Sequence, residues 1–247
     1  EFDPILMLDS FDSINPDDYT AGFPMHPHRG IETISYVSRG KMVHRDSLGN
    51  EAGISDGEVQ WMNSGSGIMH EEMVPAAERL LGVQLWLNLP AKDKMSKPSY
   101  NSIKNEDIKE IEIEGGKIRL LAGKYGEHEG YKGDYLSMDY YDIHLNADAE
   151  VTLTMEEDDS VMVFTLLGDV YIDGEHIEEK TAVKLTEGDS LTIKNGNEKA
   201  QVLYMNSRAL NEPVAWAGPI VMNTQEELQK AFLELRSNTF IKETAEY

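Results

Sequence analysis

The sequence of 247 residues predicts an all-β protein with two β-barrel domains, on three observations. Short segments rich in β-branched and aromatic residues recur along the chain and are bounded by glycine turns. Residues 80–89 alternate apolar and polar side chains, which is the period of a half-buried strand. Strands separated by Gly-Asp or Asp-Gly turns occur in both halves, which indicates two barrels of similar plan.

The first half of the chain shows a regular succession of strands and turns. The strands are expected at residues 32–37, 58–62, 68–70 and 80–89, with turns at 47–50, 56–57 and 65–67. The polar residues 90–105, interrupted by Pro98, are expected to cross from one domain to the next. We therefore expect an N-terminal domain at residues 1–112 and a C-terminal domain at residues 113–247.

The second half is expected to hold further strands and to end in a helix. Strand patterns resume at residues 116–121, 161–172 and 189–193. Thr224 and Glu227 form a capping-box pattern, in which each side chain satisfies free backbone amides of the first helical turn. The apolar residues that follow recur at helical spacing and form one stripe: Leu228, Ala231, Phe232 and Leu235. This pattern predicts a C-terminal helix at about 224–236.

Composition limits the classes of partner and the compartment. The 45 acidic and 22 basic residues give a net charge of −23, which repels phosphate backbones, so direct nucleic-acid binding is not expected. No apolar run approaches the ~18 residues of a membrane span. Cysteine is absent, which excludes thiolate catalysis and fits a reducing compartment, so we expect a cytoplasmic protein. The sequence begins at Glu1 and shows no secretory signal, and a removed targeting segment is left open.

Two short patterns suggest a metal site. His26 and His28 are two residues apart in FPMHPHRGIETISY, as are His70 and Glu72 in IMHEEM. Residues two apart in a strand project to the same face. If the two pairs lie on neighbouring strands, three imidazoles and one carboxylate converge on one point. Such a set suits a first-row metal, and six-coordinate Fe(II) or Mn(II) would keep two positions open.

Each pattern also has a plainer interpretation. A lone His-x-His pair is often two polar residues near a turn, and Pro27 disfavours a central strand. Glu32 is a rival oxygen ligand, because it shares the parity of His28 if the strand is continuous. His44 precedes a hairpin-like turn and is a candidate either for the surface or for contacting a metal ligand from outside.

Several stretches resemble the pirin family, a group of proteins with two cupin-type barrels. They are HPHRGIET, HRDSLGN, GEVQWMNSGSGIMHEEM, LGVQLWLNLP and GPIVMNTQEELQKAF, and together they touch both halves of the chain. The resemblance implies an N-terminal cupin that binds one metal ion and a C-terminal cupin that has lost its metal ligands. Pirins usually carry a further strand before a segment like DPILMLDSF, and this sequence begins almost there, so the contribution of that strand is left open.

The resemblance also implies which residues bind the metal. The family's ligands fall on His26, His28, His70 and Glu72, which leaves Glu32 and His44 as candidates to orient a ligand from outside. The implied metal is a single Fe(II), although the same donors accept Mn, Ni, Cu or Zn.

Two functions follow from the resemblance. Some pirins resemble quercetin 2,3-dioxygenases, which open a flavonol ring with O2. On that hypothesis Glu72 accepts the proton of the flavonol hydroxyl if its bond to the metal is labile. Candidates for the apolar pocket wall are Met25, Trp61, Met69 and Trp86, although core packing is the commoner role for any one such residue. The alternative is a non-catalytic, iron-dependent regulatory pirin, whose acidic surface would dock a protein partner.

Overall fold

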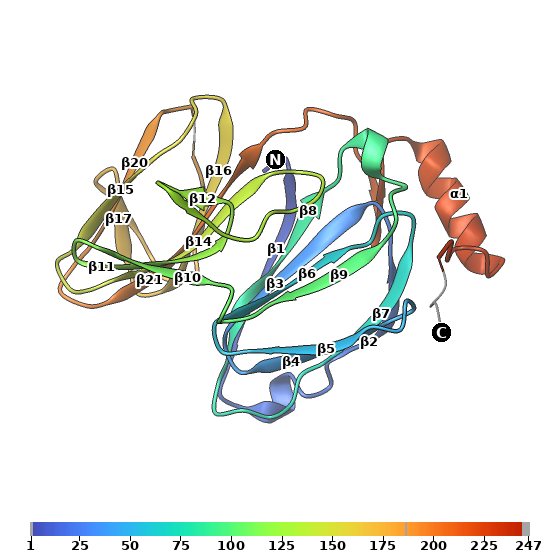
Figure 1. The fold of residues 1–247 in the computed structure, drawn as a ribbon, viewed down its shortest axis with the longest axis horizontal. Coiled ribbons are helices and arrows are strands. Elements are labelled where there is room, and N and C mark those ends of the chain that lie inside the picture. The colour runs from blue at the N-terminus through green and yellow to red at the C-terminus, as the bar shows by residue number, and fades with distance from the viewer. Residues whose placement is uncertain (1, 186, 244–247) are drawn as a thin grey trace. The chain divides into compact units, whose positions relative to one another are not determined.

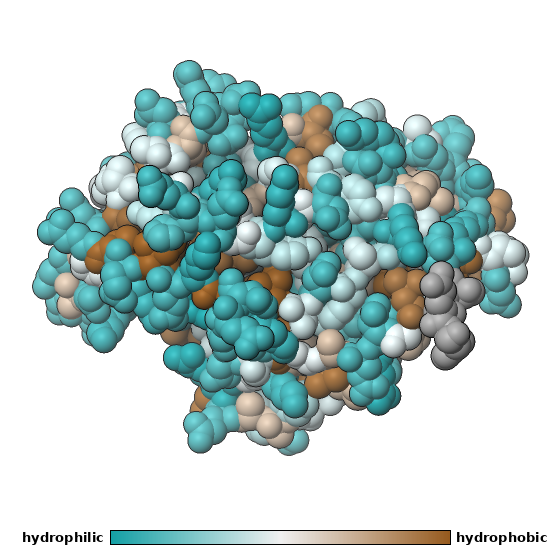
Figure 2. Space-filling model, in the orientation of Figure 1, coloured by the Kyte–Doolittle hydropathy of each residue, from teal (hydrophilic) through white to brown (hydrophobic). Residues whose placement is uncertain are grey.

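The computed structural model describes residues 2–185 and 187–243 (Figure 1). Strands dominate, and one α-helix, α1 (Gln225–Arg236), lies near the C-terminus, so the all-β prediction is confirmed. No helix in the described part of the chain is both long and apolar enough to span a bilayer. The face shown in Figure 2 is covered mainly by hydrophilic side chains, as the acidic composition leads us to expect.

Contacts divide the chain into two compact units. Unit 1 contains Asp3–Lys104 together with the segment from Leu210 onward, and unit 2 contains Asn105–Ala209. This division differs from the expected one at 1–112 and 113–247, because the C-terminal segment packs with unit 1. Local sequence patterns do not indicate that the C-terminal segment packs with the N-terminal domain, because that packing depends on contacts between residues far apart in the sequence.

Unit 1 is a barrel of two antiparallel sheets. The first has the order β1 (Ile5–Ser13), β8 (Leu80–Asn88), β3 (Ile31–Arg39), β6 (Glu58–Asn63) and β9 (Ser99–Ile103). The second has the order β2 (Phe23–His28), β7 (Ile68–Met73), β4 (Lys41–Asp46) and β5 (Glu51–Ser55). Two short 3-10 helices, Pro16–Asp18 and Ala91–Asp93, lie in connections. The expected crossing segment at 90–105 therefore includes a strand, β9, which pairs with β6.

Side-chain alternation gives the barrel of unit 1 one apolar and one polar region. Residues from both sheets form an apolar cluster: Val37, Met42, Ile54, Val74 and Leu80. Further along the same face of β3, Ser35 lies beside Gln60 and Gln84. The inner face thus changes from aliphatic to hydrogen-bonding side chains as β2 and β7 are approached. Such buried polar groups need partners, which indicates a functional region.

Unit 2 repeats the barrel plan with an apolar interior. Its larger sheet has the order β10 (Lys109–Ile113), β11 (Gly116–Ala122), β14 (Met138–Leu145), β21 (Ala200–Arg208), β16 (Asp159–Leu167) and β19 (Ala182–Lys184). The smaller has the order β15 (Glu150–Thr154), β20 (Ser190–Asn195), β17 (Val170–Ile172) and β18 (Glu175–Ile177). β12 (Lys124–Tyr125) pairs with β13 (His128–Glu129). Aliphatic and tyrosine side chains from both sheets, such as Ile143 and Leu191, fill the core.

The C-terminal segment of unit 1 is a small hairpin followed by the helix. β22 (Ala215–Ala217) pairs with β23 (Ile220–Met222). Thr224 caps α1 and forms the predicted capping box with Glu227. The apolar stripe of α1 packs on the hairpin, in a cluster made of Ala215, Ile220, Met222, Leu228, Ala231 and Phe240. The predicted helix and its stripe are confirmed.

Candidate metal centre

Three imidazoles converge at one end of β2 and β7. His26 and His28 come from β2, and His26 lies opposite His70 in the antiparallel register of β7. One ring nitrogen from each of the three residues lies within 4.8 Å of the others, which is compatible with a single metal ion. β2 is an edge strand, so Pro27 removes no ladder hydrogen bond that the sheet requires.

Hydrogen bonds define which nitrogen of each β2 histidine is free. His26 Nδ1 lies 2.8 Å from the carbonyl oxygen of Pro24, and His28 Nδ1 lies 3.1 Å from that of Pro219. A carbonyl oxygen only accepts, so each Nδ1 carries a proton and donates it. The two Nε2 atoms lie 3.0 Å apart. Burial, and then the nearby His26, lower the pKa of His28 to about 3, so His28 is neutral with a bare Nε2.

Nε2 of His70 is also left free, but the hydrogen bond at its Nδ1 goes to a histidine rather than to a carbonyl oxygen. Its Nδ1 lies 3.3 Å from Nδ1 of His44, whose Nε2 lies 2.8 Å from Oδ2 of Asp46. Because the carboxylate accepts from His44 Nε2, His44 Nδ1 is left to accept from His70. His70 Nε2 is then bare, and it is buried without a hydrogen-bond partner. Burial and the neighbouring histidines lower the pKa of His70 well below its usual value, which keeps it neutral.

His44 is therefore part of the site rather than the surface. Its side chain is fully buried and stacks on Tyr100, with ring centroids 4.1 Å apart and planes at 11°. Asp46 is fixed in turn by the backbone amides of Leu48 and Asn50 and by Nδ2 of Asn50. The sequence indicated His44 as a candidate, but it did not indicate Asp46 or Tyr100. The two-residue spacing of His44 and Asp46 on β4 was the available signal.

Glu72 lies on the same strand face as His70, opposite His44 in the register. Its Oε1 and Oε2 atoms lie 3.2 and 3.1 Å from Nε2 of Gln84, and Oε1 also accepts from Nε2 of Gln60. Burial raises the pKa of Glu72, although the hydrogen bond from Gln84 opposes the shift. The two amides fix the carboxylate, and only Oε2, which accepts from Gln84 alone, keeps a further lone pair. Among the described residues, the group whose ligand atoms lie within 4.8 Å of one another contains the three histidines and not Glu72. Glu72 as a fourth metal ligand stays a prediction.

Glu32 lies away from the three imidazoles. Ser35 on β3 faces Gln60 and Gln84, and Glu32 lies three residues earlier, on the opposite face of the strand. The expected shared parity with His28 assumed a continuous strand. Gly30 has φ +79° and separates β2 from β3, so the alternation of side chains along β2 does not continue into β3.

The four predicted wall residues do not lie together. Trp86 packs edge-on against His28, with ring centroids 5.0 Å apart and planes at 84°. Met25 and Met69 alternate with the histidines along their strands and so lie on the outer face of the sheet. Trp61 follows Gln60 and lies with Glu32 on the outer face of the other sheet. The strand assignment was right for the histidines, and the same alternation removes these three residues from the site.

The donor set fits a divalent transition metal. Three imidazoles, each with its Nδ1 directed at a hydrogen-bond partner, are buried or half-buried around one point. In a metal-binding histidine the second ring nitrogen commonly donates to a carbonyl or a neighbouring acceptor, which fixes the tautomer. Bringing three lone pairs together without a cation would be unfavourable. The orphaned Nε2 of His70 is explained by a bound ion.

Known proteins share this architecture. The family model described as Pirin matches residues 1–87, and the model described as Pirin C-terminal cupin domain matches residues 140–241. A Pseudomonas aeruginosa protein named "Putative quercetin 2,3-dioxygenase" is 38% identical, over 95% of this chain and 86% of its own length. Human Pirin is 36% identical, over 95% of this chain and 82% of its own length.

A solved structure agrees in both fold and sequence. The crystal structure of quercetin 2,3-dioxygenase from Acinetobacter baumannii superposes with a TM-score of 0.87 and 33% identity, over 96% of this chain and 86% of that one. The expected fold of two cupin domains is confirmed. With both barrels matched and more than a third of the residues shared with curated relatives, this chain is a member of the pirin family.

Proposed function

We propose that this protein is a metal-dependent dioxygenase that opens the ring of quercetin-type flavonols with O2 at a mononuclear Fe(II) site. One observation carries the proposal: three imidazoles converge so that one ring nitrogen of each lies within 4.8 Å of the others. The names of the Pseudomonas relative and of the Acinetobacter structure support the substrate class.

The protein's own groups would prepare the site. His26, His28 and His70 would hold the ion, with ring orientations set by Pro24, Pro219 and His44. Bound Fe(II) would supply a Lewis acid and a redox centre for the reaction of a flavonol with O2.

Glu72 is the candidate to accept the hydroxyl proton of the flavonol. A raised pKa makes its carboxylate a stronger base than that of an exposed glutamate. Gln84 and Gln60 hold that carboxylate in place by donating to it. Trp86, against His28, would offer an aromatic surface at the site.

Oxygen consumption tests the proposal. Anaerobically prepared protein loaded with Fe(II) should consume O2 when quercetin is added, and the His70→Ala variant should not. The Glu72→Gln variant keeps the shape and loses the base, so kcat should fall while the three histidines still hold the metal. His128→Ala, an exposed substitution in unit 2, is the control. Fully metal-loaded protein that turns over no flavonol would refute the dioxygenase.

A second candidate is a regulatory pirin without turnover. The net charge of −23 favours this candidate, because such a surface attracts a basic protein partner. It predicts a complex whose stability changes between the iron-loaded and the metal-free protein, with no O2 consumption. Side-by-side measurement of complex formation and of O2 uptake distinguishes the two candidates.

A further inference from the structure

The C-terminal hairpin reaches the metal centre. Pro219, in the turn between β22 and β23, provides the carbonyl that accepts from His28 Nδ1. Two residues later, Val221 N donates to the carbonyl oxygen of Arg29 at 3.0 Å, and Ile220 forms a bridge with Arg29. The hairpin therefore docks on the chain directly after His28. A side chain at Gly30 would collide with the carbonyl oxygen of Val221, which shows how closely the two backbones approach.

Arg29 anchors this arrangement. It is 2% exposed, and its guanidinium binds three separate segments of unit 1. Nε donates to the carbonyl oxygen of Ser66 at 2.7 Å, Nη1 to Oε2 of Glu234 at 2.8 Å and Nη2 to the carbonyl oxygen of Phe240 at 2.8 Å. The guanidinium carbon also lies 4.2 Å from the centre of the Phe240 ring. The planar guanidinium group carries several N–H donors in fixed directions, so one arginine can bind acceptors from three segments at once.

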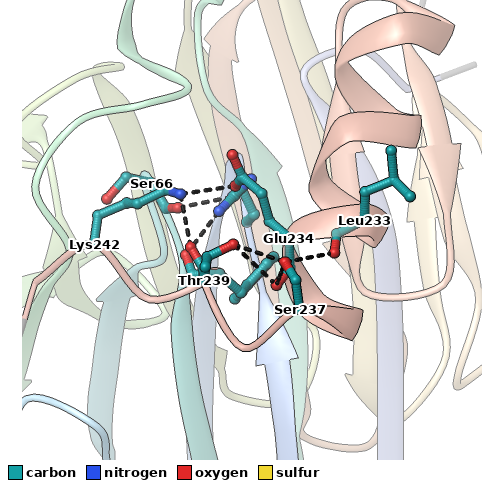
Figure 3. A network of polar contacts seen from close by, with 8 residues as sticks. Ser66, Leu233, Glu234, Ser237, Thr239 and Lys242 are labelled. Atoms are coloured by element: carbon teal, nitrogen blue, oxygen red, sulfur yellow. Dashed lines mark hydrogen bonds and ion pairs between the residues drawn. The ribbon is translucent and has the colours of Figure 1, made fainter.

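The tail after α1 completes the anchor. Glu234 also pairs with Lys242 at 2.9 Å, and Lys242 donates to the carbonyl oxygen of Thr239. Figure 3 shows Glu234, Thr239 and Lys242 gathered close to Ser66. A Cβ atom at Gly67 would lie 3.0 Å from the Phe240 ring, so the tail is closely seated on the loop that precedes β7 and His70.

We propose that the Arg29–Glu234–Phe240 anchor is a positioning device for the metal centre. It holds the hairpin so that the Pro219 carbonyl keeps His28 in the Nδ1–H tautomer, with Nε2 free for the ion. Which imidazole nitrogen is free depends on the hydrogen bond made by the other one. The inference rests on the metal site of the proposed function, but it does not depend on the reaction.

His26 provides an internal comparison within the same site. Its Nδ1 binds the carbonyl of Pro24, only two residues away on its own strand. The partner of His28 is separated from it by 191 residues along the chain. Loosening the anchor should therefore release His28 and leave the tautomer of His26 unchanged.

The test uses Glu234→Ala in the full chain, with Glu226→Ala as the control. Both remove one negative charge from α1, but Glu226 is exposed in its first turn. The two readouts are the Co(II) affinity, from competition with a chelator, and the histidine tautomers, from nitrogen-15 NMR of the metal-free protein. Loss of such an outer partner typically weakens metal binding by about 10–100-fold.

Glu234→Ala should weaken Co(II) binding within that range and shift His28 towards the Nε2–H tautomer, whereas Glu226→Ala should change neither. Folded Glu234→Ala protein with wild-type Co(II) affinity and an unchanged His28 tautomer would overturn the inference. If Glu234→Ala does not fold, Glu234→Leu replaces it in the same measurements, because leucine keeps most of the side-chain volume and removes the oxygen that accepts from Arg29. Oxygen consumption is not a readout, so failure of the dioxygenase proposal leaves this test unaffected.

Discussion

Lys94 is a buried cation whose titration should be measurable in the stability of the protein. It is 2% exposed, and its Nζ donates to the carbonyl oxygen of Gly30 at 2.7 Å and to Oδ1 of Asn88. Both partners are neutral. Burial lowers the pKa of Lys94 from 10.5 to about 8, against a smaller opposing attraction from Glu212 and Glu227.

The sign of the effect follows from the lowered pKa. Between pH 8 and 10.5 the unfolded chain keeps a proton that Lys94 has already released in the folded protein. The free energy of unfolding therefore rises with pH in this window, because the unfolded state binds more protons. At pH 7 Lys94 is protonated in the folded protein, so the unfavourable free energy of burying its ammonium group lowers the stability in full. From pH 7 to pH 9.5 the linkage relation gives a gain of about 2 kcal/mol from this group.

Urea unfolding of the wild type and of Lys94→Met at pH 7 and pH 9.5 checks this value. The variant cannot titrate at position 94, so the stability difference between the two proteins should shift by about 2 kcal/mol in favour of the wild type at pH 9.5. Lys92→Met, which removes an exposed lysine of the same segment, is the matched control. A constant difference for Lys94→Met would refute the reasoning.

Three further substitutions probe the site and its supports. His44→Phe keeps a ring against Tyr100 but removes the acceptor for His70 Nδ1. Metal affinity, measured by competition with a chelator, should therefore fall about 10–100-fold. An unchanged affinity would contradict this hydrogen-bond arrangement. Thr224→Ala removes the cap of α1 and should lower the unfolding free energy by about 1 kcal/mol in a denaturant titration. Gly30→Ala should cost more than about 1 kcal/mol in the same titration, because φ is +79°; equal stability would exclude the close approach of the hairpin.

The sequence allowed the parts of the site that depend on local spacing to be predicted. His26 and His28 share a face because residues two apart in a strand always do, and His70 and Glu72 follow the same rule. The rule failed for Glu32, because Gly30 interrupts the strand between it and His28. The rule that residues two apart share a face holds only within one continuous strand, and a glycine with positive φ interrupts the strand.

Contacts between distant segments were beyond prediction from the sequence. Gln60 and Gln84 hold Glu72, but glutamines on strands are common and carry no recognisable spacing. The acceptor from Pro219 is a backbone carbonyl, which every residue possesses. The barrels and the helix could be predicted because they rest on periodic patterns and caps, whereas the packing of the C-terminal segment with unit 1 rests on unpatterned tertiary contacts.

The discontinuity of unit 1 has a consequence for the order of events during translation. A ribosome synthesises residues 3–104, with the three histidines of the metal centre, before it has completed the intervening residues 105–209. Such a nascent chain lacks the carbonyl of Pro219 and both C-terminal partners of Arg29, which are 205 and 211 residues away from it. The metal centre is thus among the last parts of the protein to be completed, and an ion that arrives early meets a site with one histidine not yet oriented.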